Sequence, residues 1–199
     1  MDKRSNGVSA LERLGTIADV QMGYPFRTRL KHDPGGAVAV IQMKDIDDTN
    51  LLRPENAIRT TLPAGNAHHL LREGDLLFRS RGRSNGAALV GAGTGPAVLA
   101  APMLRIRPHG ALPEYLSWFI NAPATQAMLA ATSEGTSVRM ISAEALRNLP
   151  VPVPNVEIQR RIVEAAMLSQ REQALMTEVA ARRHFLVTTI LMQSAQKGQ

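Results

Sequence analysis

The hydrophobic residues of the C-terminal part of the chain recur at helical spacing. From Glu157 to Gln193 there is neither Gly nor Pro, and good helix formers such as Ala, Leu, Gln and Glu dominate. A helix of about 38 residues is roughly 57 Å long. Apolar residues return to one of its faces at Ile158, Ile162, Ala165, Leu168, Leu175, Val179, Leu186 and Ile190. Arg182 and Arg183 interrupt this stripe.

A small domain cannot cover a helix of that length, so the apolar stripe predicts a helical partner along most of it. Packing of the helix on its own domain is the alternative interpretation. The expected contact residues are the large members of the stripe, namely Ile158, Ile162, Leu168, Leu175, Val179, Leu186 and Ile190.

The pattern before residue 150 is different, because short apolar runs alternate with turn-forming residues. Residues 1–10 show no pattern and predict a loose terminus. Strands are expected at Ala37–Met43, Leu76–Phe78, Ala87–Gly91 and Ala97–Arg107, and helices at Glu114–Asn121, Ala124–Ala131 and Ala143–Arg147. We therefore predict an α+β fold, with a mixed domain in residues 1–150, a Pro-rich spacer in 151–156 and the long helix in 157–199.

The charge of the chain points to a polyanionic partner. The net charge is +6 over 199 residues and the isoelectric point is about 10.5. Nearly all basic residues are Arg, since Lys occurs only at positions 3, 31, 44 and 197. Arg contacts phosphate and guanine edges in a bidentate manner. A GC-rich genome also replaces Lys by Arg, so the distribution of Arg carries more information than its total.

Basic residues gather in polar, turn-rich segments. Three Arg alternate in RSRGRSNG, three cations alternate in FRTRLKHDPGG, and another Arg lies in SEGTSVRMIS. Each segment alone is typical of a solvated surface loop, but several in one small domain favour anion binding. The candidate DNA contacts are Arg27, Arg29, Lys31, Arg79, Arg81, Arg83, Ser84, Asn85, Ser137 and Arg139.

The residues that common enzymes require are missing from the sequence. No Lys lies in a Gly-Lys-Ser/Thr loop, no acid stands two positions before a Lys, and no Pro-Pro pair exists. Pro96 replaces the third Gly in GAGTGP, so this segment predicts a turn between strands. The adjacent His68 and His69 would point to opposite sides of a strand, and acidic turns such as Asp45–Asp48 are usually solvated. We expect no catalytic residue, no metal site and no cofactor.

The location follows from what the chain lacks. It has no Cys, which suits a reducing compartment, and it has no apolar run of membrane-spanning length. A cytoplasmic protein without a membrane contact is expected.

An ordered series of segments resembles a known family. The series runs LGTIADVQMGYPF, VIQMKDID, LREGDLLFRSRG, APMLRIRP, LPEYLSWFIN and GTSVRMISAEALRNLPVPVPNVEIQRRI. It is similar to the specificity subunit of type I restriction-modification systems and covers nearly all of the chain from Leu14 onward. Family members usually carry two target-recognition domains and two long helices in about twice this length. This chain resembles half of such a subunit.

The resemblance implies a non-catalytic role. The domain would be a target-recognition domain that reads one half of a split sequence in double-stranded DNA. The long helix would be a spacer and would dock the methyltransferase (modification) subunits, and through them the restriction subunit. Two chains would form a homodimer through an antiparallel coiled coil, and the target would then be palindromic and bipartite. The alternative is a protein–protein adaptor that assembles partners without reading DNA, although an adaptor has no need of the Arg-rich loops.

Overall fold

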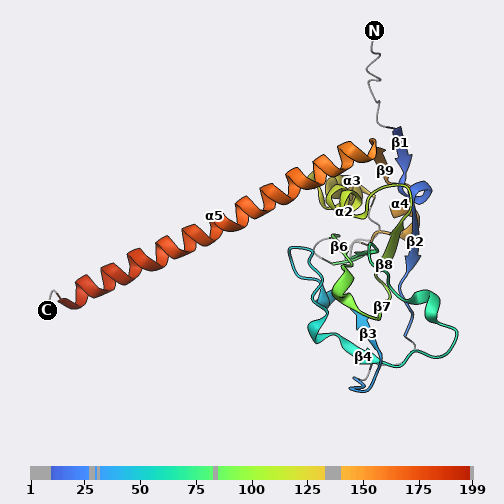
Figure 1. Cartoon of the computed structure of the whole chain (residues 1–199), viewed down its shortest axis with the longest axis horizontal. Coiled ribbons are helices and arrows are strands. Elements are labelled where there is room, and N and C mark those ends of the chain that lie inside the picture. The colour runs from blue at the N-terminus through green and yellow to red at the C-terminus, as the bar shows by residue number, and fades with distance from the viewer. Residues whose placement is uncertain (1–9, 27–29, 31, 83–84, 133–139, 198–199) are drawn as a thin grey trace, which may run out of the picture. The chain divides into compact units, whose positions relative to one another are not determined.

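The computed structural model describes residues 10–26, 30, 32–82, 85–132 and 140–197. The chain divides into two compact units, Met1–Arg160 and Arg161–Gln199. The first unit holds all the strands and the short helices, and the second consists of most of a long helix (Figure 1). The expected α+β fold with a long C-terminal helix is confirmed.

An antiparallel four-stranded sheet forms the centre of the first unit. Its strands lie in the order β2 (Ala18–Met22), β8 (Leu104–Pro108), β5 (Leu76–Phe78) and β6 (Ala87–Leu89). Leu76 and Phe78 pair with Ile106 and Leu104, and all four side chains are buried. Leu77 lies between Leu76 and Phe78 and is also buried, so β5 is covered on both faces.

A smaller sheet covers one face of this central sheet. It contains β4 (Ile58–Thr60), β3 (Val38–Ile41) and β7 (Ala97–Leu99), with β3 parallel to β7 and antiparallel to β4. Leu77 and Ala88 of the central sheet pack in one cluster with Ile41 and Leu99 of the smaller sheet. The expected strand at Ala97–Arg107 is therefore wrong as a single element, because β7 and β8 belong to different sheets.

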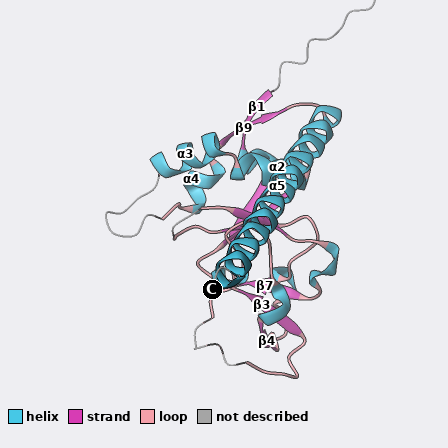
Figure 2. Cartoon of the chain, turned by 90° about the vertical axis from the view of Figure 1, so that its left-hand side faces the viewer, coloured by secondary structure: helices cyan, strands magenta, loops and turns pink. Residues whose placement is uncertain are grey.

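Short helices lie at the other end of the domain from the smaller sheet. Figures 1 and 2 both place α2, α3 and α4 on the side away from β3, β4 and β7. The helices are α1 (Leu14–Ile17), α2 (Pro113–Asn121), α3 (Pro123–Ala131) and α4 (Ala143–Arg147). Pro occupies the first position of α2 and of α3, and the Ser142 hydroxyl accepts a hydrogen bond from Ala145 N at the start of α4. These starts agree with the sequence predictions.

Four single turns of 3₁₀ helix connect the strands. They are η1 (Met43–Asp45), η2 (Pro54–Asn56), η3 (Ala67–His69) and η4 (Ala92–Thr94). The GAGTGP segment, which contains η4, joins β6 to β7 as the predicted strand-to-strand turn. His68 and His69 lie in η3, so the expectation that they belong to a strand is wrong.

The Pro-rich segment before the long helix is a strand, not a free spacer. Residues Pro150–Val153 form β9, which pairs antiparallel with β1 (Ala10–Arg13). The extended backbone agrees with the sequence analysis, but the pairing was not predicted. Pro150 and Pro152 cannot donate hydrogen bonds, and a two-stranded ladder tolerates them because each strand has a free edge.

The first turn of the long helix α5 (Val156–Lys197) is fastened to the domain by a buried amide. Gln159 is buried, its Oε1 accepts a hydrogen bond from Leu112 N at 2.9 Å, and its Nε2 donates to Pro154 O at 2.8 Å. Asn155 Oδ1 accepts from Ile158 N and caps the helix. The Tyr115 hydroxyl donates to Pro152 O at 2.6 Å. The sequence VPVPNVEIQ thus encodes both a strand and an anchored helix start.

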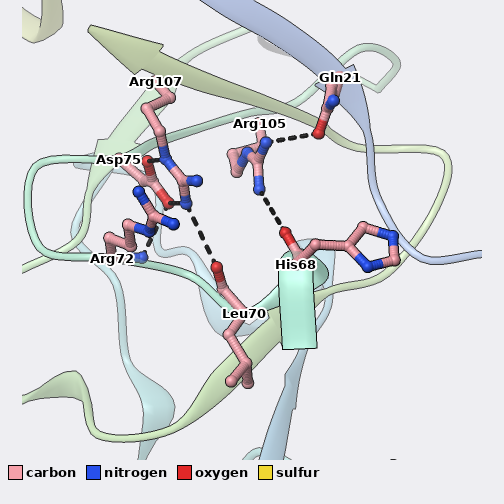
Figure 3. Close-up of polar contacts among 7 residues, drawn as sticks. All are labelled: Gln21, His68, Leu70, Arg72, Asp75, Arg105 and Arg107. Atoms are coloured by element: carbon pink, nitrogen blue, oxygen red, sulfur yellow. Dashed lines mark hydrogen bonds and ion pairs between the residues drawn. The ribbon is translucent and has the colours of Figure 1, made fainter. Parts of the chain in front are cut away.

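A buried ion pair holds the turn that precedes β5 (Figure 3). Asp75 is 1% exposed and receives two hydrogen bonds of 2.7 Å from the Arg107 guanidinium, together with one from Arg72 N. Arg107 also donates to Leu70 O. The hydrogen bonds that Arg107 donates to Asp75 are the main reason that the pKa of Arg107 lies above its ordinary value. Gly74 in this turn has a φ of +85°, which favours Gly.

We predict that Arg107→Ala destabilises the domain, because it leaves the buried Asp75 carboxylate without its ion pair. A loss of about 3 kcal/mol is expected from the cost of an uncompensated buried charge. Arg53→Ala is the matched control, since Arg53 pairs with Asp47 on the surface and its loss should cost under about 1 kcal/mol. Equilibrium denaturation measures both. Equal losses for the two variants would contradict the structural role of the Asp75 pair.

Candidate nucleic-acid interface

Two of the predicted basic loops meet at their described ends. The first loop, residues 79–86, connects β5 to β6, and the second, residues 132–142, connects α3 to α4. Arg81 forms an isolated antiparallel bridge with Met140, and Ile141 N donates to Ser80 O at 2.8 Å. Arg81 is exposed. Segments that are sixty residues apart in sequence are thus brought together beside a solvent-facing guanidinium, which the sequence alone could not place.

Arg79 has a different position from the one that the sequence suggested. Its side chain is only 8% exposed, and Nη2 donates to Asn50 Oδ1 at 2.5 Å. Its backbone N donates to Gly86 O, and its carbonyl accepts from Asn85 Nδ2. A guanidinium buried in this way does not face a duplex. Arg79 and Asn85 are hydrogen-bonded to each other at the base of the 79–86 loop. Of the three described candidates in this loop, Arg81 is the exposed one.

Asn50 reaches the base of the loop from a distant turn. Its backbone φ is +61°, a conformation in which Asn is one of the tolerated residues. Besides accepting from Arg79, Asn50 donates from Nδ2 to Asn121 Oδ1 at 3.2 Å. A Cβ on Gly86 would lie 1.9 Å from Asn50 Oδ1. Gly86 is therefore needed for this close approach.

The turn that presents Asn50 is held by Asp47. The Asp47 carboxylate accepts from Thr49 Oγ1 at 2.6 Å and from Leu51 N at 2.9 Å. These hydrogen bonds, that from the Thr49 side chain above all, lower the pKa of Asp47 from 3.8 to about 2. Because the folded pKa lies below the ordinary value, the turn is stabilised above about pH 4 and loses this contribution as the pH falls toward 2.

Side chains at the helical end of the domain bind the C-terminal end of the 79–86 loop. The Asn121 side chain donates to Ala87 O at 2.8 Å and accepts from Ala87 N at 2.9 Å, so it pairs with the edge strand as another strand would. Gln126 Nε2 donates to Asn85 O and to Ile120 O. We call Asn50, Arg79, Asn121 and Gln126 the loop brace. Sequence analysis missed Asn50, Asn121 and Gln126, because single amides separated by dozens of residues carry no recognisable motif.

The described residues beside the third basic segment contact the smaller sheet. Phe26 and Leu30 pack on a cluster that contains Val40 and Val98 of that sheet. Tyr24 contacts both Phe26 and His69 through its ring. Phe26 and Leu30 thus lie against β3 and β7, whereas the described ends of the 79–86 loop continue from β5 and into β6. The seven remaining candidate residues, Arg27, Arg29, Lys31, Arg83, Ser84, Ser137 and Arg139, lie outside the described residues.

Other residues that could have carried chemistry have structural roles in the described part of the chain. Asp45 is buried and caps the turn of η1 by accepting from Gln42 N. Burial lowers the pKa of His69, and the rings of His68 and His69 lie 4.1 Å apart. Among the described residues, no cluster of three or more His, Cys, Asp or Glu is arranged to hold a metal ion. No helix among them is both long enough and apolar enough to cross a membrane.

The predicted contact face of α5 is open to solvent in the single chain. Leu168, Leu175, Val179, Leu186 and Ile190 are all more than half exposed, whereas Ile162 is partly buried. Ile158, in the first turn, is 40% exposed. Contiguous exposed apolar side chains on this scale are typical of a surface that binds another protein.

We predict that Asn121→Ala loosens the 79–86 loop without unfolding the domain. The variant loses both hydrogen bonds to Ala87 and the contact with Asn50, so amide hydrogen exchange at Ala87 and Arg79 should accelerate by roughly tenfold or more, as expected for a loss of over 1.4 kcal/mol. Asn66→Ala, which removes a single hydrogen bond to Pro63 O in another turn, is the control. Unchanged exchange at both amides in Asn121→Ala would show that the loop brace does not hold the loop.

The chain was compared with known proteins. No protein-family model and no curated protein matches it. A chain from the work "Structural basis underlying complex assembly and conformational transition of the type I R-M system" matches with a TM-score of 0.69 and 21% identity. The HsdS subunit from Thermoanaerobacter tengcongensis matches with a TM-score of 0.63 and 20% identity. The type I restriction-modification S subunit from M. genitalium matches with a TM-score of 0.58 and 14% identity.

The extent of these matches is uneven. They cover 92%, 90% and 89% of this chain, but only 43%, 41% and 43% of the respective solved chains. The chain thus spans less than half the length of the structures that it matches. At these identities the likeness concerns the fold, and a mixed α+β domain followed by a long helix is the fold that this chain shares with these solved structures.

Proposed function

We propose that this chain is a non-catalytic, sequence-specific DNA-recognition subunit of a type I restriction-modification system. The observation that carries the proposal is the likeness of fold to HsdS structures along 90% or more of this chain in two cases. The ordered sequence segments from Leu14 onward support it independently, since they resemble the same family. Methyl transfer and DNA cleavage would belong to the modification and restriction subunits.

The proposed DNA contact lies where the 79–86 loop meets the segment before α4. Arg81 is exposed there, and the adjoining stretches of sequence contain Arg83, Ser84, Ser137 and Arg139. A basic loop whose base is fixed by buried hydrogen bonds suits base reading, because a preorganised contact loses less entropy on binding. The positive net charge supplies the sequence-independent attraction to phosphate.

We infer that two copies of this chain associate, because a second copy would cover the apolar side chains that α5 leaves exposed and would bring together two recognition domains and two long helices. The exposed apolar side chains of α5 are the proposed surface for this self-association and for the modification subunits. A closed dimer has a two-fold axis, so the two domains would read inverted half-sites. We propose that such a complex acts on DNA in the cytoplasm.

We predict that Arg81→Ala, alone and with Arg83→Ala, weakens binding to duplex DNA. If an Arg contacts phosphate, its loss should weaken binding to all sequences and reduce the salt slope by about one; if it reads a base, the loss should be about 1–3 kcal/mol, mainly on the preferred site. Arg160→Ala is the control, because this exposed Arg pairs with Glu157 near the start of α5. Binding isotherms at several salt concentrations give both quantities.

Two results would decide against the proposal. If the folded double variant binds DNA with the affinity and the salt slope of the parent, the 79–86 loop is not part of the DNA contact. Failure of the parent protein, with modification subunits present, to prefer any sequence in a random duplex pool would favour the adaptor over the DNA reader.

A further inference from the structure

Two opposite charges lie inside the apolar stripe of α5. Glu172 and Arg183 line the same shallow groove as Leu168, Leu175, Met176 and Val179. Arg171 also lines the groove, but it lies about 100° around the helix from Glu172, to the side of the stripe. Glu172 and Arg183 are about three helical turns apart, so they project in nearly the same direction as the apolar residues between them. Along the helix the groove therefore begins at Leu168, has Glu172 near its N-terminal end and ends at Arg183.

Neither charge is used within the helix. The ion pairs of the described part of α5 are Arg160–Glu157 and Arg182–Glu178, and both leave Glu172 and Arg183 without an ionic partner. A partner that buries the stripe must also bury these two charges. An unpaired charge in an apolar interface is strongly unfavourable, so the partner has to present an opposite charge to each at the right spacing.

We propose that the partner is a second copy of this chain, paired antiparallel in the register that sets Glu172 of each copy against Arg183 of the other. The inference rests on the self-association included in the proposed function. Because the two charges have opposite signs and one chain runs opposite to the other, a single alignment satisfies both charges of both chains. The two-fold axis then passes between Thr177 and Glu178.

The same register sets four pairs of apolar residues against one another, whereas Leu186 falls opposite Ser169 and Ile162 opposite Gln193. It sets Met176 opposite Val179, Leu175 opposite Ala180, Leu168 opposite Val187 and Ala165 opposite Ile190. All of these lie on the helix Val156–Lys197, and nearly the whole of that helix overlaps with its copy. Sliding one helix by about one turn would set Glu172 against Val179 and Leu168 against Arg183. A parallel pair would set Glu172 against Glu172.

Glu172 and Arg183 would therefore fix the register of the two paired helices. Buried ion pairs add little net stability, but misaligned ones are costly, and a polar residue in an apolar seam is a known means of fixing the register of paired helices. A fixed register would fix the separation of the two recognition domains. The spacing between half-sites in DNA would then depend on two side chains in each chain.

Reversal of the two charges tests the proposed pairing. Glu172→Arg sets two Arg against each other twice in every dimer, and Arg183→Glu does the same with two Glu. Each single variant should weaken dimerisation at least about tenfold in sedimentation experiments, and the double variant should recover the parental value. Gln170→Arg and Thr188→Glu, on the opposite side of the helix, are controls that introduce the same charged side chains and should leave the dimer unchanged.

Cysteine cross-linking tests the register without altering charge, since the chain has no native Cys. Leu168→Cys and Val187→Cys proteins should each resist oxidation to a covalent dimer alone, and should form a disulfide with each other when mixed. Self-cross-linking of Leu168→Cys would show a parallel pair and would overturn the proposal. Double charge reversal that fails to restore the dimer would also overturn it.

The outcome for DNA binding is separate. A parent protein that sediments as a monomer at tens of micromolar but still selects a half-site would overturn the second copy as partner and leave the recognition function standing. A dimer of the proposed register that prefers no DNA sequence, with modification subunits present, would overturn the recognition function alone.

Discussion

The burial of strand β5 on both faces is the constraint on which the rest of the domain depends. Leu76 and Phe78 point to one side of the central sheet, and Leu77 points to the other, where the smaller sheet covers it. A shift of the register of β5 by one residue would bring Asp75 or Arg79 to a position that Leu76 or Phe78 now occupies. The two ends of β5 are consequently fixed in position. A charged residue adjoins each end, Asp75 before the strand and Arg79 after it.

The polar groups at these two ends differ in exposure. At the start of β5, Asp75 is buried, binds Arg107 of β8 and secures the turn. At its end, Arg79 turns inward to Asn50, while Arg81, two residues later, faces solvent. In a continuous strand Arg79 and Arg81 would lie on the same side. They differ because β5 ends at Phe78, and Arg81 instead forms a bridge with Met140.

The sequence was informative where periodicity or local hydrogen bonding decides the structure. The long helix, the Pro starts of α2 and α3 and the Ser142 cap all follow from local rules. The pairing of β9 with β1 and the separation of β7 from β8 were not predictable, since they depend on which strands meet in space. The loop brace escaped prediction for the same reason, because Asn50 and Asn121 become neighbours only in the folded chain.

We propose that the domain reads DNA as one half of a two-fold assembly. The most direct test is selection of bound sites from a pool of random duplexes by the full chain together with its modification subunits, followed by sequencing. The two-fold assembly predicts two short inverted half-sites separated by an unread spacer of constant length. A continuous site, two half-sites in direct repeat or a spacer of variable length would contradict it.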